Sequence, residues 1–254
     1  MDALIFHKRI KTMNREYHKW FSQHLQRDME LLIFGHAGRA VIFFPTRMAR
    51  FYDYENWGII ASLNTQIENG ELQLFCVDSI DGESFYNDEV FPSVRIDRHL
   101  QYEKYLLEEV LSLIYQKNKG DYVETAGCSM GAYHAINLAL KYPWLFKKAV
   151  GISGRYDLTN NIGDFRDLLN GFRSDEVYFN MPAQYMANLN DDRLLSEVRN
   201  MEIILAVGET DPFLNGNQHL SSLLWEKGIP NLFHTWESNA HRPRYWRKMA
   251  PMYI

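Results

Sequence analysis

Seven short apolar runs, separated by segments with helical periodicity, set the strongest constraint on how this chain folds. Each run has about the length of a β-strand, and several are continuous, which is typical of parallel strands covered on both faces. Helical spacing of apolar residues marks Val94–Lys117, Ala132–Tyr142 and Asn217–Lys227. The alternation predicts an α/β fold with a mostly parallel central sheet and helices on both faces. The apolar runs are Glu30–Phe34, Ala40–Phe44, Gln73–Val77, Tyr122–Ala126, Lys148–Ile152, Ile203–Val207 and Leu232–Trp236.

Length and composition favour a single folded unit. The chain has 254 residues, of which 46% are hydrophobic, so it can bury a substantial core. Since no Pro/Gly/Ser-rich linker divides the sequence, we predict one domain over residues 1–254. Asp157 to Arg199 is polar, Asn-rich and interspersed with aromatic residues. We predict that this segment is a lid-like excursion from the core that covers the active site.

Charge and cysteine content exclude several classes of protein. The formal net charge of −5 gives no basic surface for nucleic acid. Cys76 and Cys128 are the only cysteines, and neither belongs to a pair with metal-ligand spacing, so we expect no metal site. The sequence has no apolar stretch near the ~20 residues of a membrane span, and Met1–Arg15 lacks the pattern of a signal peptide. We expect a cytoplasmic protein with no nucleic-acid or membrane partner.

The pentapeptide Gly127-Cys128-Ser129-Met130-Gly131 has the pattern G-x-S-x-G. It follows one apolar run and precedes a predicted helix, and in that setting the serine occupies a strained turn with its hydroxyl exposed. The two glycines let the strand and the helix approach closely. We predict that Ser129 is a nucleophile and that the Met130 backbone N–H is an oxyanion-hole donor at the helix N-terminus. The alternative is a glycine-shaped turn in which Ser129 only caps the helix.

A serine nucleophile needs a general base, and the base needs an orienting carboxylate. In folds with this turn, the acid and then the histidine follow the serine along the chain. Three histidines are candidates. His219 lies on a predicted helix, His234 lies inside a predicted strand, and His241 follows that strand in a polar loop. Because a loop at the end of the strand can reach Ser129, we predict that His241 is the base.

The acid is expected just after a strand. Asp211 follows the run Ile203–Val207 within Gly208-Glu209-Thr210-Asp211-Pro212, and Glu209 is its close rival. Asp157 follows the preceding strand and is the topological alternative, unless it serves only as a turn or capping residue. We favour Asp211.

Two further sets of residues complete the predicted site. Thr46 and Arg47 follow the run Ala40–Phe44, where a second oxyanion donor is expected, and we favour the N–H of Arg47. Aromatic residues that line a cleft would suit an apolar or aromatic acyl group, although each can instead pack in the core. The candidates for substrate contact are Trp57, Tyr86 and Tyr156, followed by Phe165, Tyr178 and Phe179.

With these residues identified, the chain resembles the putative-esterase family, which contains esterase D, feruloyl esterases and mycolyltransferases. The resemblance runs from about residue 20 to the C-terminus. Ala240 departs from the family pattern, in which Gly-His is commoner than Ala-His, but His241 itself is in place. The matching segments are the pentapeptide around Ser129 with its Ala-rich helix, Tyr142-Pro143, Phe146, Gly151-Ile152-Ser153-Gly154, Ser84-Phe85-Tyr86-Asn87-Asp88, Gly208 through Phe213, and Ala240-His241 with Tyr245-Trp246.

The resemblance implies an α/β-hydrolase fold and carboxylic-ester hydrolysis or acyl transfer, without a metal or an organic cofactor. It assigns the triad to Ser129, Asp211 and His241, and the oxyanion hole to Met130 with the Arg47 region. We therefore predict a serine esterase that hydrolyses a small-molecule ester through an acyl-enzyme. The alternatives are an acyltransferase with the same triad and a catalytically silent binding protein, and the fold is compatible with a homo-oligomer.

Overall fold

The structure is a computed structural model that describes residues 13–254. Its centre is an eight-stranded sheet with the order β1-β2-β4-β3-β5-β6-β7-β8. The strands from β4 to β8 in this order are parallel, whereas β1, β2 and β4 pair antiparallel. The predicted mostly parallel sheet is confirmed. The strands are β1 (Arg15–Ser22), β2 (Arg27–Phe34), β3 (Arg39–Phe44), β4 (Leu72–Val77), β5 (Val123–Cys128), β6 (Phe146–Ile152), β7 (Glu202–Gly208) and β8 (Leu232–Trp236).

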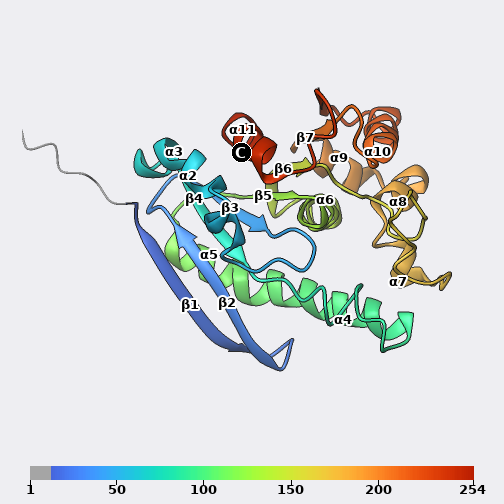
Figure 1. The fold of residues 1–254 in the computed structure, drawn as a ribbon, viewed down its shortest axis with the longest axis horizontal. Coiled ribbons are helices and arrows are strands. Elements are labelled where there is room, and N and C mark those ends of the chain that lie inside the picture. The colour runs from blue at the N-terminus through green and yellow to red at the C-terminus, as the bar shows by residue number, and fades with distance from the viewer. Residues whose placement is uncertain (1–12) are drawn as a thin grey trace, which may run out of the picture.

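Helices lie on both faces of the sheet, as predicted (Figure 1). One face carries α1 (Asp53–Asn56), α2 (Ile59–Ser62), α3 (Asn64–Glu68) and α11 (Pro243–Tyr253). The other carries a continuous helical stretch made of α4 (Pro92–Lys104), the π-helical η1 (Tyr105–Val110) and α5 (Leu111–Lys117), together with α6 (Met130–Lys141) and α10 (Leu214–Glu226). Within residues 13–254, no helix combines the length and apolar character needed to cross a bilayer.

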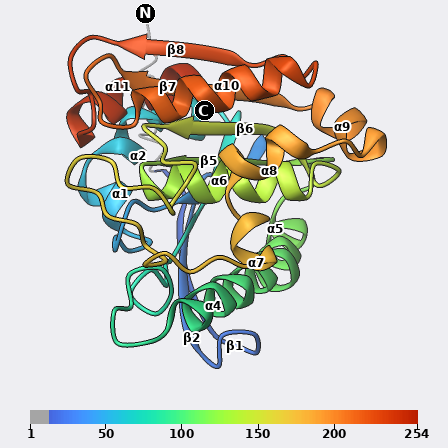
Figure 2. The ribbon, with the colours of Figure 1, turned by 90° about the vertical axis from the view of Figure 1, so that its right-hand side faces the viewer.

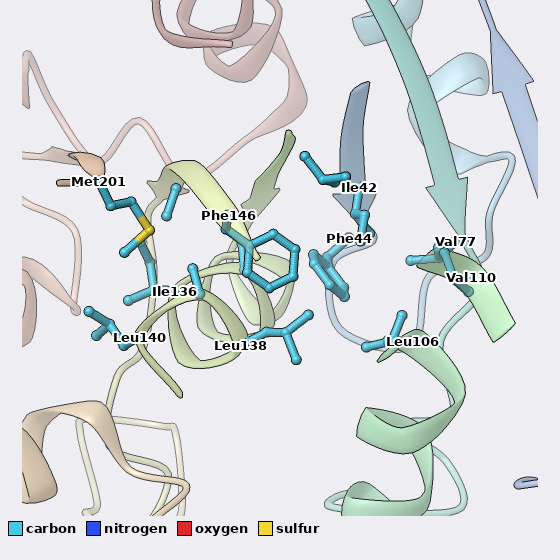
Figure 3. Close-up of a cluster of buried hydrophobic side chains, with 14 of the residues drawn as sticks. Ile42, Phe44, Val77, Leu106, Val110, Ile136, Leu138, Leu140, Phe146 and Met201 are labelled. Atoms are coloured by element: carbon cyan, nitrogen blue, oxygen red, sulfur yellow. The ribbon is translucent and has the colours of Figure 1, made fainter. Parts of the chain in front are cut away.

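The alternation of side chains along β3 divides the interior into two cores. Ile42 and Phe44 join a cluster with η1, α5 and α6, whereas Val41 and Phe43 join a cluster with α2 and α11. All four side chains are fully buried, which explains why the run is continuously apolar. Figure 3 shows the first cluster, where side chains from β3, β4, η1, α6 and β6 meet.

Strand β1 was not predicted because it lies at the edge of the sheet. Its side chains alternate between exposed and half-buried, and its charged residues interrupt any apolar run. It pairs with the whole length of β2, which begins at Arg27 rather than at Glu30. Trp20 attaches β1 to the core, since its ring stacks on Tyr105 at 5.7 Å and its Nε1–H donates to Glu109.

The segment 157–199 contains three short helices in addition to loops. They are α7 (Asp175–Tyr178), α8 (Pro182–Asn188) and α9 (Asp192–Arg199), and Figure 2 shows α8 alongside α6. Leu158, Val177 and Met181 are buried in a third cluster with Met130 and Tyr133 of α6. The predicted excursion is therefore packed against the helix that follows Ser129.

Strand β5 and helix α6 approach each other at two glycines. A Cβ on Gly127 would collide with the backbone of Gly131. A Cβ on Gly131 would collide with the carbonyl oxygen of Phe44 and lie 2.6 Å from that of Pro45. Because those atoms belong to the backbone, no side-chain rotation can relieve the contact, and both positions require glycine.

We predict that Gly131→Ala lowers the free energy of unfolding by about 1–3 kcal/mol, since the added methyl group overpacks a backbone contact. Gly216, within α10, is the matched control, because no atom lies within 4 Å of an added Cβ there. Gly216→Ala should change the stability little or raise it by up to about 1 kcal/mol through helix propensity. Urea unfolding of both variants measures the difference, and equal stabilities would contradict the packing argument.

Candidate active site

Ser129 lies in the one-residue turn between β5 and α6, and its backbone is strained. Its φ of 57° and ψ of −118° place a non-glycine residue at a positive φ. The turn is held by a hydrogen bond of 2.8 Å from the Ser129 N–H to the carbonyl of Ile152 in the neighbouring strand β6. This is the geometry that the G-x-S-x-G pattern predicts, with the serine at the end of the strand and at the N-terminus of the helix.

Tyr54 ties this turn to the loop after β3. Its hydroxyl donates to the carbonyl of Phe44 at 2.7 Å and accepts the N–H of Cys128 at 2.9 Å. Complete burial raises the pKa of the Tyr54 hydroxyl well above its usual value, so it stays protonated and keeps both bonds. Tyr54 was not predicted from the sequence, because a lone tyrosine on a short helix carries no motif.

His241 lies between Ser129 and Asp211 and is hydrogen-bonded to both. Its Nε2 is 3.0 Å from Ser129 Oγ, and its Nδ1 is 2.9 Å from Asp211 Oδ2. The Asp211 side chain is fully buried, whereas 18% of the His241 side chain is exposed. The second carboxylate oxygen of Asp211 accepts the N–H of Phe213 at 2.9 Å, which fixes its orientation. The structure therefore brings together the three residues selected from the sequence.

The loop before His241 rests directly on strand β7. A Cβ on Gly208 would collide with the backbone of Ser238 and Asn239, so only a glycine admits the loop at this point. Ser238 and Ala240 both have a positive φ, and the Oδ1 of Asn239 accepts the N–H of His241. The φ of 52° at Ala240 explains why glycine is commoner at this position in the family, since a glycine would be unstrained there and the alanine is not.

The rejected candidates lie elsewhere. Glu209 is exposed and accepts the backbone N–H of Ser238. Asp157 is a turn residue whose oxygens accept from Thr159, Asn160 and Gln184. His219 is exposed on α10, and His234 stacks on Tyr253 at 4.9 Å.

Two residues beside Ser129 have unpaired backbone donors. Within residues 13–254, the N–H groups of Met130 and Arg47 have no protein acceptor. Both residues line a cavity with Ser129. The loop that carries Arg47 is held by Asp81, whose carboxylate accepts the N–H of Met48 at 2.9 Å, and Met48 has a φ of 57°.

The cavity beside Ser129 has a volume of about 260 Å³. Of the predicted substrate contacts, Tyr86 and Phe165 line it, and Thr46, the alternative oxyanion residue, lines it too. Arg155, Phe213 and Trp246 line it as well. They were not selected from the sequence because only the tertiary structure brings them to the cavity. The complete lining is Thr46, Arg47, Tyr86, Ser129, Met130, Arg155, Phe165, Phe213, His241 and Trp246.

Trp57 and Tyr156 do not line this cavity, contrary to expectation. Trp57 packs beside Trp246, with their ring centroids 6.3 Å apart. Tyr156 is 1% exposed and lies under β6, where it occupies the space that a side chain at Gly151 would need. Tyr178 and Phe179 line a different cavity, beside α8. The aromatic content of the sequence could not distinguish these core and surface positions from the cavity wall.

The thiol beside Ser129 is not a competing nucleophile. Cys128 is fully buried, and burial raises the pKa of its thiol to about 12, so it is not a thiolate at neutral pH. The part of the chain that the structure describes also contains no group of three or more His, Cys, Asp or Glu residues placed to hold a metal ion. By contrast, the Ser129 hydroxyl has an imidazole nitrogen within hydrogen-bond distance.

Comparison with protein families assigns the chain to one family. The profile of the family described as "Putative esterase" matches residues 54–248, which include Ser129, Asp211 and His241. The chain belongs to this family. The resemblance stated from the sequence is confirmed, and the membership supports a hydrolase that acts on esters. No curated protein matched the chain in a sequence comparison.

Several solved structures share the fold of this family member. A ferulic acid esterase superposes with a TM-score of 0.76 at 15% identity, covering 95% of this chain and 96% of its own. An S-formylglutathione hydrolase from Agrobacterium tumefaciens gives 0.73 at 17% identity and 95% coverage of both chains. Mycobacterium tuberculosis MPT51 gives 0.67 at 15% identity, covering 93% and 96%. The predicted α/β-hydrolase fold is confirmed.

Proposed function

We propose that the protein is a serine esterase that hydrolyses a carboxylic ester through an acyl-enzyme on Ser129. The observation that carries the proposal is the unbroken chain of hydrogen bonds from Ser129 Oγ through His241 to the buried carboxylate of Asp211. A serine hydroxyl is a weak nucleophile unless a base removes its proton as it attacks. His241 is within hydrogen-bond reach of that proton, and family membership supports action on esters.

In the first half of the reaction, His241 Nε2 takes the Ser129 proton while Ser129 Oγ attacks the ester carbonyl. The Nδ1–H of His241 donates to Asp211, which holds the imidazole in the tautomer that leaves Nε2 free to accept. The imidazolium that forms lies against the Asp211 carboxylate, which is excluded from water and is therefore strongly stabilising. His241 then gives its proton to the departing alcohol.

The oxyanion of the tetrahedral intermediate is stabilised by the N–H groups of Met130 and Arg47. Both lack a protein acceptor, so they are available to the substrate, and Asp81 positions the Arg47 loop through Met48. The Met130 N–H also lies at the N-terminus of α6, where the helix dipole favours negative charge. Water then attacks the acyl-enzyme with His241 as the base again, and Ser129 is regenerated.

Ser129→Ala tests the proposal directly. It should lower kcat for p-nitrophenyl acetate and butyrate by about 10³-fold or more, because no nucleophile remains. Circular dichroism and urea unfolding check that the variant folds. Steady-state kinetics that show full activity in a folded Ser129→Ala protein would rule the proposal out.

Asp211→Asn and Asp157→Asn form a matched pair that tests which acid orients His241. Asp211→Asn should reduce kcat by about 10³- to 10⁴-fold, since the amide no longer fixes the productive tautomer. Asp157→Asn should stay within a few-fold of the wild type, because Asp157 bonds only within its own turn and to α8. If Asp157→Asn lowered kcat more than Asp211→Asn, the acid would be Asp157, which follows β6.

A further inference from the structure

Arg155 is a buried cation beside the proposed nucleophile. It follows β6 and is only 5% exposed, yet it lines the cavity that holds Ser129 and His241. The hydrogen bonds of its guanidinium all run from Nη2, to the carbonyls of Asn160 at 2.5 Å, of Arg166 at 2.7 Å and, at 3.5 Å, of Leu158. Its Nε is buried and has no acceptor among residues 13–254.

No carboxylate of the described residues pairs with Arg155. Asp157 and Asp167 act on it only from a distance, and their oxygens accept other donors. Asp157 bonds to Thr159, Asn160 and Gln184, and Asp167 bonds to backbone N–H groups and to Arg173. A buried charge without a partner is costly, so such groups are normally paired by another charge.

The tyrosine beside Arg155 does not supply the missing negative charge. Burial is the main cause that raises the pKa of the Tyr86 hydroxyl to about 12. Tyr86 is therefore neutral at pH 7, although three cations, Arg47, Arg155 and Arg166, act on it. The guanidinium carbon of Arg47 is 5.7 Å from the Tyr86 ring centroid.

The cavity is a positively charged site on an acidic protein. Two of its ten lining residues are arginines, and none is Asp or Glu, whereas the whole chain carries a formal charge of −5. The one carboxylate close to the reacting atoms, Asp211, has no exposed side-chain surface and is bonded to His241. An anionic ligand would meet unpaired donors here and no carboxylate in the cavity wall. The nearby Asp81, which acts on Tyr86, is 2% exposed and already accepts the N–H of Met48.

We propose that Arg155, assisted by Arg47, forms an anion subsite beside Ser129, and that the ester this protein hydrolyses carries a carboxylate in its acyl or its alcohol part. This inference rests on the proposed esterase function and names its substrate class. Arg155 binds the carboxylate through the N–H donors that the protein leaves free, and the Tyr86 hydroxyl adds a neutral donor. Arg155 is thus a specificity residue, and its Nη2 bonds hold the loop that carries Phe165.

The test compares each anionic ester with its neutral amide match. Monomethyl adipate and its terminal amide place the charge in the acyl part, and 4-acetoxybutanoate and its amide place it in the alcohol part. For the wild type, kcat/KM should be about 10- to 100-fold higher for the anionic member of one pair, which is the effect of one charge-assisted hydrogen bond. The pair that shows the preference identifies whether the carboxylate belongs to the acyl part or to the alcohol part of the ester.

Substitutions distinguish binding of the anion by Arg155 from a role of Arg155 in holding the loop alone. Arg155→Met should reduce the anionic-to-neutral ratio to near one, and Arg155→Lys should keep most of it, although both lose the Nη2 bonds. Arg244→Met removes an equal charge from an exposed arginine that stacks on Tyr245 outside the cavity, and it should keep the wild-type ratio. If Arg155→Met misfolds, Arg47→Met replaces it, since Arg47 is exposed, and the ratio should again fall.

Calorimetric titration with adipate, and with adipamide as the neutral match, needs no turnover. Adipate should bind the wild type at least about 10-fold more tightly than it binds Arg155→Met. A ratio near one for both ester pairs, together with no adipate binding, would overturn the subsite while hydrolysis of the neutral esters upheld the esterase. Adipate binding without hydrolysis of any ester would overturn the esterase and leave the subsite in place. If Arg155→Met and Arg244→Met lowered the anionic-to-neutral ratio equally, the preference would come from the net charge of the protein, and the subsite would be overturned.

Discussion

The close contact between strand β5 and helix α6 is the constraint on which the rest of the site depends. At Gly127 and Gly131 the two backbones leave no room for a side chain. The chain can pass from strand to helix there only if the intervening residue, Ser129, takes a positive φ. The strain fixes the direction of the serine side chain, and the hydrogen bonds of Tyr54 and Ile152 to this turn keep it in place.

The parallel sheet brings the remaining groups to the same edge. Strands β5, β7 and β8 run in one direction, so the loops that follow them meet at their carboxyl ends. Ser129, Asp211 and His241 each follow one of these strands, which turns residues far apart in sequence into neighbours. The His241 loop can lie against the end of β7 because Gly208 has no side chain to collide with the backbone of Ser238 and Asn239. This arrangement places a buried carboxylate, an imidazole and a hydroxyl in line.

Local patterns were enough to predict the parallel sheet and the three residues in line, because each of these residues depends on a strand and the short segment that follows it. The cavity wall was predicted poorly for the opposite reason. Tyr86 lines the cavity. Tyr156 instead packs against β6, in the space left by the missing side chain of Gly151, and this contact depends on the tertiary structure. Arg155 gave no signal either, since an unpaired cation becomes evident only when its neighbours in space are known. Strand β1 was not predicted because an edge strand need not be apolar.

Labelling with a fluorophosphonate tests most directly the central claim that His241 activates Ser129. The reagent reacts with a serine whose proton is removed by a neighbouring base. We predict one adduct per folded protein, located on Ser129 by peptide mass spectrometry, and a strongly reduced labelling rate in His241→Ala. No adduct, an adduct on another residue, or an unchanged rate in folded His241→Ala would contradict it.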